Sequence, residues 1–270
     1  MKRHLRNYLL ITFVLSFSYT ALIIESGGVR HFGLPGLVFM MWIPGLVALL
    51  YRKYSGLGFD DAGWKWGALK YQLLAVAVPL LLALLTNLIC VGFSVRKFSL
   101  LAQALWPKFG AFALLSMVAG IFGALGEELG WRGFLVPKLY QAKVKRPLLT
   151  SGLIWAFWHL PLITLGHYYK IQAPFLIGVT YSLTIVGLGY FIGWLRIVSG
   201  SVWVATLAHA SHNFFFQLAI TYSFFGKEGV NGKYWEVIGG DAGIVPALLY
   251  FAVIILGYRL LKLPTAQANS

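Results

Sequence analysis

Two adjacent carboxylates and an arginine lie near the end of an apolar segment, residues 114–136, with a spacing that suits catalysis. On a helix, Glu128 and Arg132 stand four residues apart with the acid first, which favours an ion pair on one face. Glu127 is turned about 100° away from Glu128, so it is expected to remain free. A free carboxylate in an apolar pocket can take a proton from water. Glu127 is therefore the candidate general base, and Glu128 with Arg132 is its support.

The same three residues also have a purely structural interpretation. They could form a buried network that only fixes helix packing, with Gly126 and Gly130 as a contact surface of small residues. Charge at membrane depth is costly, however, and it marks a functional site by default. We therefore place the functional interpretation first.

Two histidines lie near the middle of later apolar runs, where they could face one cavity. Trp155 precedes His159 by one helical turn, and Asn213 follows His209 by one turn, so each pair shares a helix face. An imidazole beside a carboxylate can polarise a water molecule, and His and Asn side chains can donate hydrogen bonds to a developing oxyanion. A single histidine is more often a packing residue, but the combination with Glu127 indicates function.

The composition places these residues in a membrane. The chain is 59% hydrophobic and 11% charged, with a mean hydropathy of +0.76, whereas about a quarter of the residues of soluble domains are charged. The 22 Lys and Arg exceed the 8 Asp and Glu, but they form short clusters between apolar runs, where they act as topology signals and contact anionic lipid. No nucleic-acid partner is indicated. Cys90, the single cysteine, excludes an internal disulfide and a thiolate metal site.

Eight apolar runs predict the fold. We expect an all-α, polytopic membrane protein whose roughly eight transmembrane helices enclose an intramembrane cavity, in a single domain over residues 1–270. The mixed basic and apolar pattern of residues 94–108 suits a helix lying in the membrane interface. The predicted spans are residues 8–24, 34–51, 71–93, 114–136, 148–165, 175–195, 202–222 and 244–261.

The basic residues predict the orientation of these spans. Alternate connecting segments, counted from the N-terminus, hold 15 Lys and Arg, and the other segments hold seven. Short loops rich in Lys and Arg stay in the cytoplasm, so both termini are expected there. The expected location is a bacterial inner membrane.

The three motifs, in this order, resemble one known family. They are Glu-Glu-x-x-x-Arg from Glu127, aromatic-x-x-x-His from Trp155, and His-x-x-x-Asn from His209. Together they look like the CPBP family, which comprises CAAX proteases and bacteriocin-processing enzymes and is also called Abi. The resemblance covers the fourth to the seventh apolar run, a protease core over approximately residues 109–222.

The resemblance implies an intramembrane endopeptidase of the type that includes the prenyl-protein-specific CAAX endopeptidase. In that family the first Glu activates water together with the histidine of the second motif, which places these roles on Glu127 and His159. The His and Asn of the third motif stabilise the oxyanion, which places that role on His209 and Asn213. The family usually has Phe where this chain has Trp155, and the difference suggests a different pocket wall.

The metal requirement stays open at this point. His159, His209 and Glu127 form a ligand set known for catalytic zinc, and members of the family are often described as metalloproteases. The chain lacks a His-Glu-x-x-His sequence, and Glu127 cannot readily serve as both the sole base and a ligand. We expect a glutamate-activated water without a required cofactor, with zinc as the alternative.

The expected partners are membrane lipid and a membrane-associated protein or peptide substrate, of which a prenylated protein is one candidate. Two other classes of function remain. A non-catalytic bacteriocin-immunity or scaffold protein would share the fold without hydrolysis. A proton or metal transporter would use the same buried groups, but it would usually show related halves, which this sequence does not.

The orientation can be tested with reporter fusions. We expect a reporter that is active only in the cytoplasm to be active at the C-terminus, because the 15 to 7 distribution of basic residues favours cytoplasmic termini. A fusion after residue 165 should give the opposite signal. A C-terminal reporter active only outside the cytoplasm would contradict the predicted topology.

Overall fold

The computed structural model describes residues 1–98, 106–169, 173–219, 225–226 and 235–261. Almost all of the regular structure in these residues is helical, which confirms the predicted all-α class. The α-helices are α1 (Lys2–Glu25), α2 (Val29–Ser55), α3 (Leu69–Gly92), α4 (Trp106–Gly130), α5 (Val136–Gln141), α6 (Pro147–Leu165), α7 (Pro174–Ser199), α8 (Val202–Asn213), α10 (Trp235–Ile238) and α11 (Ile244–Leu261). Two π-helical segments, η2 (Trp131–Leu135) and η3 (Phe214–Ala219), continue α4 and α8 respectively.

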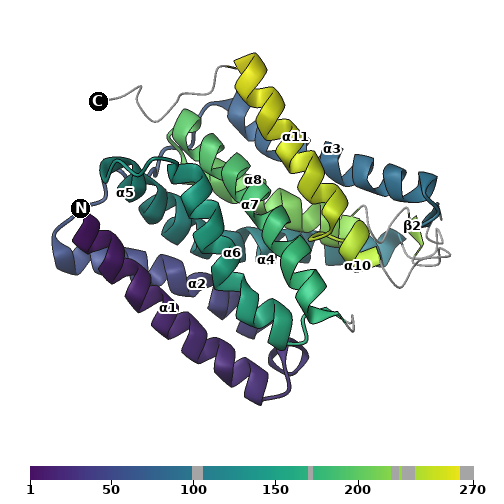
Figure 1. Ribbon diagram of the computed structural model, residues 1–270, viewed down its shortest axis with the longest axis horizontal. Coiled ribbons are helices and arrows are strands. Elements are labelled where there is room, and N and C mark those ends of the chain that lie inside the picture. The colour runs from purple at the N-terminus through teal and green to yellow at the C-terminus, as the bar shows by residue number, and fades with distance from the viewer. Residues whose placement is uncertain (99–105, 170–172, 220–224, 227–234, 262–270) are drawn as a thin grey trace.

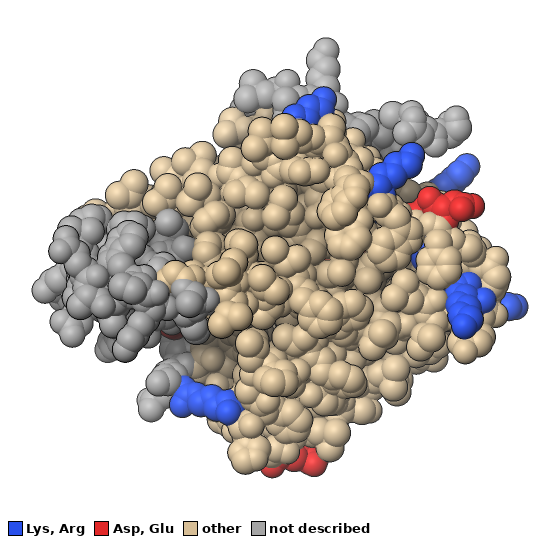
Figure 2. Space-filling model, turned by 180° about the vertical axis from the view of Figure 1, so that it is seen from behind, with Lys and Arg blue, Asp and Glu red and all other residues tan. Residues whose placement is uncertain are grey.

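Six helices are long and apolar enough to cross a membrane: α1, α2, α3, α6, α7, and α4 together with η2 and α5. The two remaining predicted spans are occupied by α8 with η3 and by α11, which has a shorter apolar stretch, Ile244–Gly257. Figure 2 shows a broad uncharged surface whose charged side chains lie mainly at its periphery. The chain is an integral, multi-pass membrane protein, while the count of eight spans stays a prediction.

The helices form one bundle whose first and last helices meet the same end of the molecule. In Figure 1 the helices run from upper left to lower right; α1 begins at the left near α5, and α11 finishes at the top, so both ends lie at the upper-left end of the helix axes. The most extensive packing joins α6 to α7, α2 to α4, α7 to α11, and α3 and α4 to α8. The helices that carry the candidate site, α4, α6 and α8, are therefore held by neighbours on several sides.

The interfacial helix expected over residues 94–108 is wrong for residues 94–98. Residues Lys97–Phe98 form a short strand, β1, which pairs antiparallel with β2 (Phe225–Gly226). A distant segment thus satisfies backbone groups that a local amphipathic pattern would assign to a helix. Residues 99–105 lie outside the described residues, and α4 begins at Trp106.

Glycines bring α4 against α2 at the level of the two glutamates. A Cβ atom on Gly126 would lie 2.7 Å from the Trp42 Cα, and one on Gly130 would lie 2.5 Å from the Pro44 Cβ. Real side chains do not tolerate such distances, so these positions allow the close backbone approach that small residues provide in membrane helices. The packing role foreseen for Gly126 and Gly130 is confirmed, and it holds the helix that carries the candidate acids.

A π-helical turn, η2, separates α4 from the proline at the start of α5. Pro137 lacks an N–H, which would leave the Gly133 carbonyl without its usual helical donor. The Arg52 Nη2 atom donates a 2.7 Å hydrogen bond to this carbonyl oxygen from α2. A neighbouring helix thus satisfies the freed carbonyl, as membrane helices that contain proline require.

Three cations, from α2, α5 and α7, contact Asp61. The Asp61 carboxylate pairs with Arg52 at 2.6 Å and with Lys138 at 2.7 Å. The Arg196 Nη2 atom donates to the Asp61 backbone oxygen at 2.7 Å. All three cations belong to the set of 15 basic residues that predicts the cytoplasmic side. We call this group the Asp61 cluster.

The Asp61 cluster should make the stability of the folded protein vary with pH in the acid range. Burial opposes ionisation of Asp61, but hydrogen bonds from Lys138 and Arg52 outweigh it, so its pKa lies below the ordinary value of 3.8. A carboxylate whose pKa is lowered on folding stabilises the protein at pH values above its ordinary pKa. This stabilisation is lost as the pH falls through the lowered pKa. We expect Asp61→Asn to lower the melting temperature at pH 7, and the difference from wild type to shrink below about pH 4.

The matched control is Asp60→Asn, because Asp60 is exposed and adjacent to Asp61. It should leave the melting temperature in detergent unchanged at both pH values. A difference between Asp61→Asn and wild type that is as large at pH 3 as at pH 7 would contradict the ion-pair assignment.

Candidate active site

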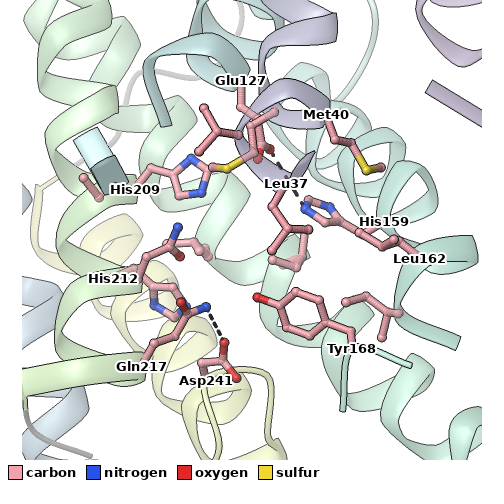
Figure 3. A pocket seen from close by; sticks show the side chains of 18 of the residues that line it. Leu37, Met40, Glu127, His159, Leu162, Tyr168, His209, His212, Gln217 and Asp241 are labelled. Carbon is pink, nitrogen blue, oxygen red and sulfur yellow. Dashed lines mark hydrogen bonds and ion pairs between the residues drawn. The ribbon is translucent and has the colours of Figure 1, made fainter. Parts of the chain in front are cut away.

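One cavity of about 350 Å³ brings together all four residues that the sequence singles out for catalysis. Glu127, His159, His209 and Asn213 line it, and they come from α4, α6 and α8. Figure 3 shows the Glu127, His159 and His209 side chains directed toward one another across the upper part of the cavity. Glu127 and the two histidines are almost completely buried, so their polar atoms face the cavity or each other.

The Glu127 carboxylate is not free, contrary to the expectation from its position on the helix. The Trp155 indole Nε1 donates a 2.6 Å hydrogen bond to Glu127 Oε2. Trp155 was expected only to form part of a pocket wall, whereas its N–H orients the candidate base. Phenylalanine at this position would have no such donor.

His159 is held by the same tryptophan and faces Glu127. Its Nδ1 atom lies 2.9 Å from the Trp155 backbone oxygen, and its Nε2 atom lies 4.0 Å from Glu127 Oε2. A carbonyl oxygen can only accept, so Nδ1 is the protonated nitrogen. In the neutral imidazole, Nε2 is then an acceptor that faces the carboxylate.

A second buried network lies behind these groups. The predicted ion pair is present, with Arg132 Nη1 at 2.8 Å from Glu128 Oε1 and both side chains fully buried. The same carboxylate oxygen lies 2.9 Å from His209 Nδ1, a contact that the sequence did not reveal. Glu128 thus connects η2 with α8 and orients one of the histidines of the cavity.

Arg132 has further partners that fix its position. Its guanidinium carbon lies 4.1 Å from the centre of the Trp155 ring, and its Nη2 donates to the Gly189 oxygen at 3.3 Å. Gly189 is on α7, and a Cβ there would come within 3.1 Å of the guanidinium and of the tryptophan ring. The arginine therefore neutralises Glu128 and also packs against the residue that holds Glu127.

His209 and Asn213 lie on the same face of α8, in its last two turns. Asn213 is half-buried and borders the cavity, immediately before the π-helix η3. π-helical turns are frequent at functional sites because the extra residue re-aims the side chains that follow. Here η3 carries Gln217 to the border of the same cavity.

The cavity also contains polar residues that the sequence did not single out. Asp241, Gln217 and Tyr168 line the part near the end of α6 and the start of α11. The sequence gives only a weak indication that Asp241 belongs to the site, since it is an isolated acid at the end of a polar segment before an apolar run. Its proximity to the other residues depends on helix packing.

The proposed zinc ligands do not form a metal site in this arrangement. Glu127 Oε2 accepts from Trp155 and lies 4.0 Å from His159 Nε2, while His209 directs Nδ1 at Glu128. Within the described part of the chain, no three His, Cys, Asp or Glu side chains converge closely enough to hold a metal ion. The side chains as placed do not converge on a metal ion, and the metal requirement stays a prediction.

The fold and the cavity define an intramembrane site built from carboxylate and imidazole groups. Residues 109–215 match the family of type II CAAX prenyl endopeptidases, described as Rce1-like. The family resemblance expected from the three motifs is thus confirmed, and this part of the chain carries an Rce1-like domain. The match supports a peptidase of the CAAX type. No curated protein matches the chain.

Replacing Arg132 should destabilise the protein. Removal of one partner from a buried ion pair leaves the other charge uncompensated, which typically costs about 3–5 kcal/mol. We expect Arg132→Ala to lower the yield of folded protein in detergent and its melting temperature. Arg6→Ala, which removes an exposed arginine, should change neither. An unchanged melting temperature for Arg132→Ala would contradict a stabilising role of the pair.

Proposed function

We propose that this protein is an intramembrane endopeptidase that hydrolyses a peptide bond with a water molecule activated by Glu127 and His159. The observation that carries the proposal is the pair of acceptors facing the cavity, Glu127 Oε2 and His159 Nε2, which lie 4.0 Å apart. One water molecule can donate a hydrogen bond to both atoms at this separation. The match to CAAX endopeptidases supports the same reaction class.

In this proposal Glu127 acts as the general base. The carboxylate takes a proton from the bound water as the water oxygen attacks the peptide carbonyl, and it later gives this proton to the leaving amine. His159 accepts the second hydrogen bond of the water and fixes its direction of attack. Trp155 positions both residues, since its indole donates to Glu127 and its backbone oxygen accepts from His159.

His209 and Asn213 are proposed to stabilise the oxyanion. The Asn213 amide can donate directly, whereas His209 already uses Nδ1 toward Glu128. A donor at His209 Nε2 then requires the doubly protonated ring, which keeps its Nδ1–H directed at the carboxylate that Glu128 shares with Arg132. Preorganised donors of this kind stabilise charge that develops in the transition state. Glu128 therefore has an electrostatic role in addition to its pairing with Arg132.

The lining of the cavity suits a substrate that is itself associated with the membrane. Leu37, Val38 and Met41 of α2 and Ala119 of α4 form an apolar wall beside the catalytic groups. Such a wall can accept the lipid-embedded part of a protein or peptide. A prenylated protein is one candidate substrate, and membrane lipid is the other expected partner.

The direction of the cavity suggests the side from which the substrate comes. The cavity extends from Glu127 to Tyr168 and Asp241, at the end of the bundle opposite the Asp61 cluster. If the protein lies in a bacterial inner membrane with cytoplasmic termini, that end faces the exterior. We propose that the substrate enters from the outer half of the membrane.

The assignment of the base can be tested with matched variants in proteoliposomes. Glu127→Gln keeps the shape of the side chain and its hydrogen bond from Trp155, but it removes the basic oxygen. General-base assistance is worth about 10²–10⁴-fold in rate, and we expect a loss of that size with folding retained. His159→Ala should lose a comparable amount. Asn213→Ala removes one oxyanion donor and should cost about 10²–10³-fold.

Cleavage of membrane-anchored peptide libraries, followed by mass spectrometry, provides the measurement. Undiminished cleavage by folded Glu127→Gln protein would refute the assignment of the base. The assay is run with and without a chelator. A complete loss of activity with chelator that zinc reverses would show that the reactive water is bound to a metal held by His159 and His209. Absence of cleavage by the wild type would instead favour a scaffold or immunity protein.

A further inference from the structure

The end of the cavity away from Glu127 is built around a second carboxylate. The Tyr169 hydroxyl donates to Asp241 Oδ1 at 2.9 Å, and the Gln217 Nε2 atom donates to Asp241 Oδ2 at 2.7 Å. Figure 3 shows Asp241 and Gln217 below the histidines, on the opposite side of the cavity from Glu127. We call Asp241, Gln217 and Tyr169 the Asp241 cluster.

Three segments that are distant in sequence hold this cluster in place. Tyr169 follows α6, Gln217 lies on η3, and Asp241 lies in the turn between α10 and α11. The turn is fixed to α7, because the Thr184 hydroxyl donates to the Gly243 oxygen at 3.0 Å. The carboxylate is therefore prepositioned by the bundle.

The charge of Asp241 is not balanced within the described part of the chain. Its two side-chain donors are a hydroxyl and an amide, and no lysine or arginine among the described residues lines the cavity. Burial raises the pKa of Asp241 even though Gln217 and Tyr169 donate to it. A partly buried carboxylate without a cation is costly, and a cation placed beside it would offset that cost.

The Asp241 carboxylate remains accessible from the cavity. The residue is half-buried and lines the space that also contains Glu127 and Asn213. A peptide bound across the catalytic groups would therefore place a neighbouring side chain near Asp241. A substrate carboxylate at that position would meet a like charge, whereas a lysine or arginine would meet an opposite one.

We propose that Asp241 is a specificity-determining residue that binds a positively charged side chain of the substrate peptide near the scissile bond. The proposal rests on the peptidase function proposed above. It makes Gln217 and Tyr169 positioning residues, which hold the carboxylate in the orientation that a cation requires.

Binding to an inactive variant tests the proposal without requiring cleavage. The probes are fluorescent peptides anchored by a farnesyl-cysteine, with lysine or norleucine at each flanking position in turn. Norleucine keeps the aliphatic length of lysine without its charge. Vesicles of phosphatidylcholine have no net charge, so lysine gains nothing from the lipid surface. The receptor is Glu127→Gln protein, with and without Asp241→Asn.

We expect the peptide with lysine at one position to bind about tenfold more tightly than the peptide with norleucine there. Opposite charges at interfaces can have an effect of this size on affinity. Asp241→Asn should reduce this ratio to nearly one while leaving the affinity for the norleucine peptide unchanged. Asp241→Glu, which retains the charge, should retain most of the preference. Asp60→Asn, an exposed carboxylate outside the cavity, is the control and should have no effect.

The outcomes separate this inference from the peptidase function. Equal affinity for the lysine and norleucine peptides at every position, whether strong or weak, would overturn the role of Asp241. A preference for lysine that persists in folded Asp241→Asn protein would also overturn it. Lysine-dependent binding without cleavage by the wild type would support the site and overturn only the peptidase function.

Discussion

The buried ion pair between Glu128 and Arg132 is the interaction on which the site depends. Each charge alone would be expensive to remove from water, and the pair is tolerated because each partner has additional contacts. Glu128 also accepts from His209, and Arg132 packs over Trp155, which in turn donates to Glu127. One neutralised pair thus fixes both the candidate base and the proposed oxyanion donor, and its loss would disturb the whole proposed catalytic arrangement.

Much of this organisation follows from local patterns in the sequence. Apolar run lengths predict the helices, and spacing of four residues predicts the pairing of Glu128 with Arg132 and the shared face of His209 and Asn213. The contacts that join different helices do not follow from such spacing. The hydrogen bonds of Trp155 to Glu127 and of His209 to Glu128 depend on how α4, α6 and α8 pack. The same reason explains why Asp241 was missed, since its partners lie on distant segments.

Trp155 illustrates why a contact between helices can change the meaning of a residue. In the sequence it is an aromatic residue one turn before a histidine, and its size suggests a wall of the pocket. In the structure its indole N–H, its backbone oxygen and its ring face each contact a different group of the site. One residue therefore positions a carboxylate, an imidazole and a guanidinium.

The close approach of α2 and α4 affects how genetic screens of this protein should be interpreted. Gly126 and Gly130 flank the two glutamates in sequence, but they face the Trp42 and Pro44 backbone, where even one added carbon would collide. Randomised libraries should therefore lose function at the glycines as completely as at the acids, although the glycines perform no chemistry. Sorting the library for membrane expression before scoring activity would separate the glycines from Glu127, because glycine variants would disappear at the expression step whereas Glu127 variants would lose only activity.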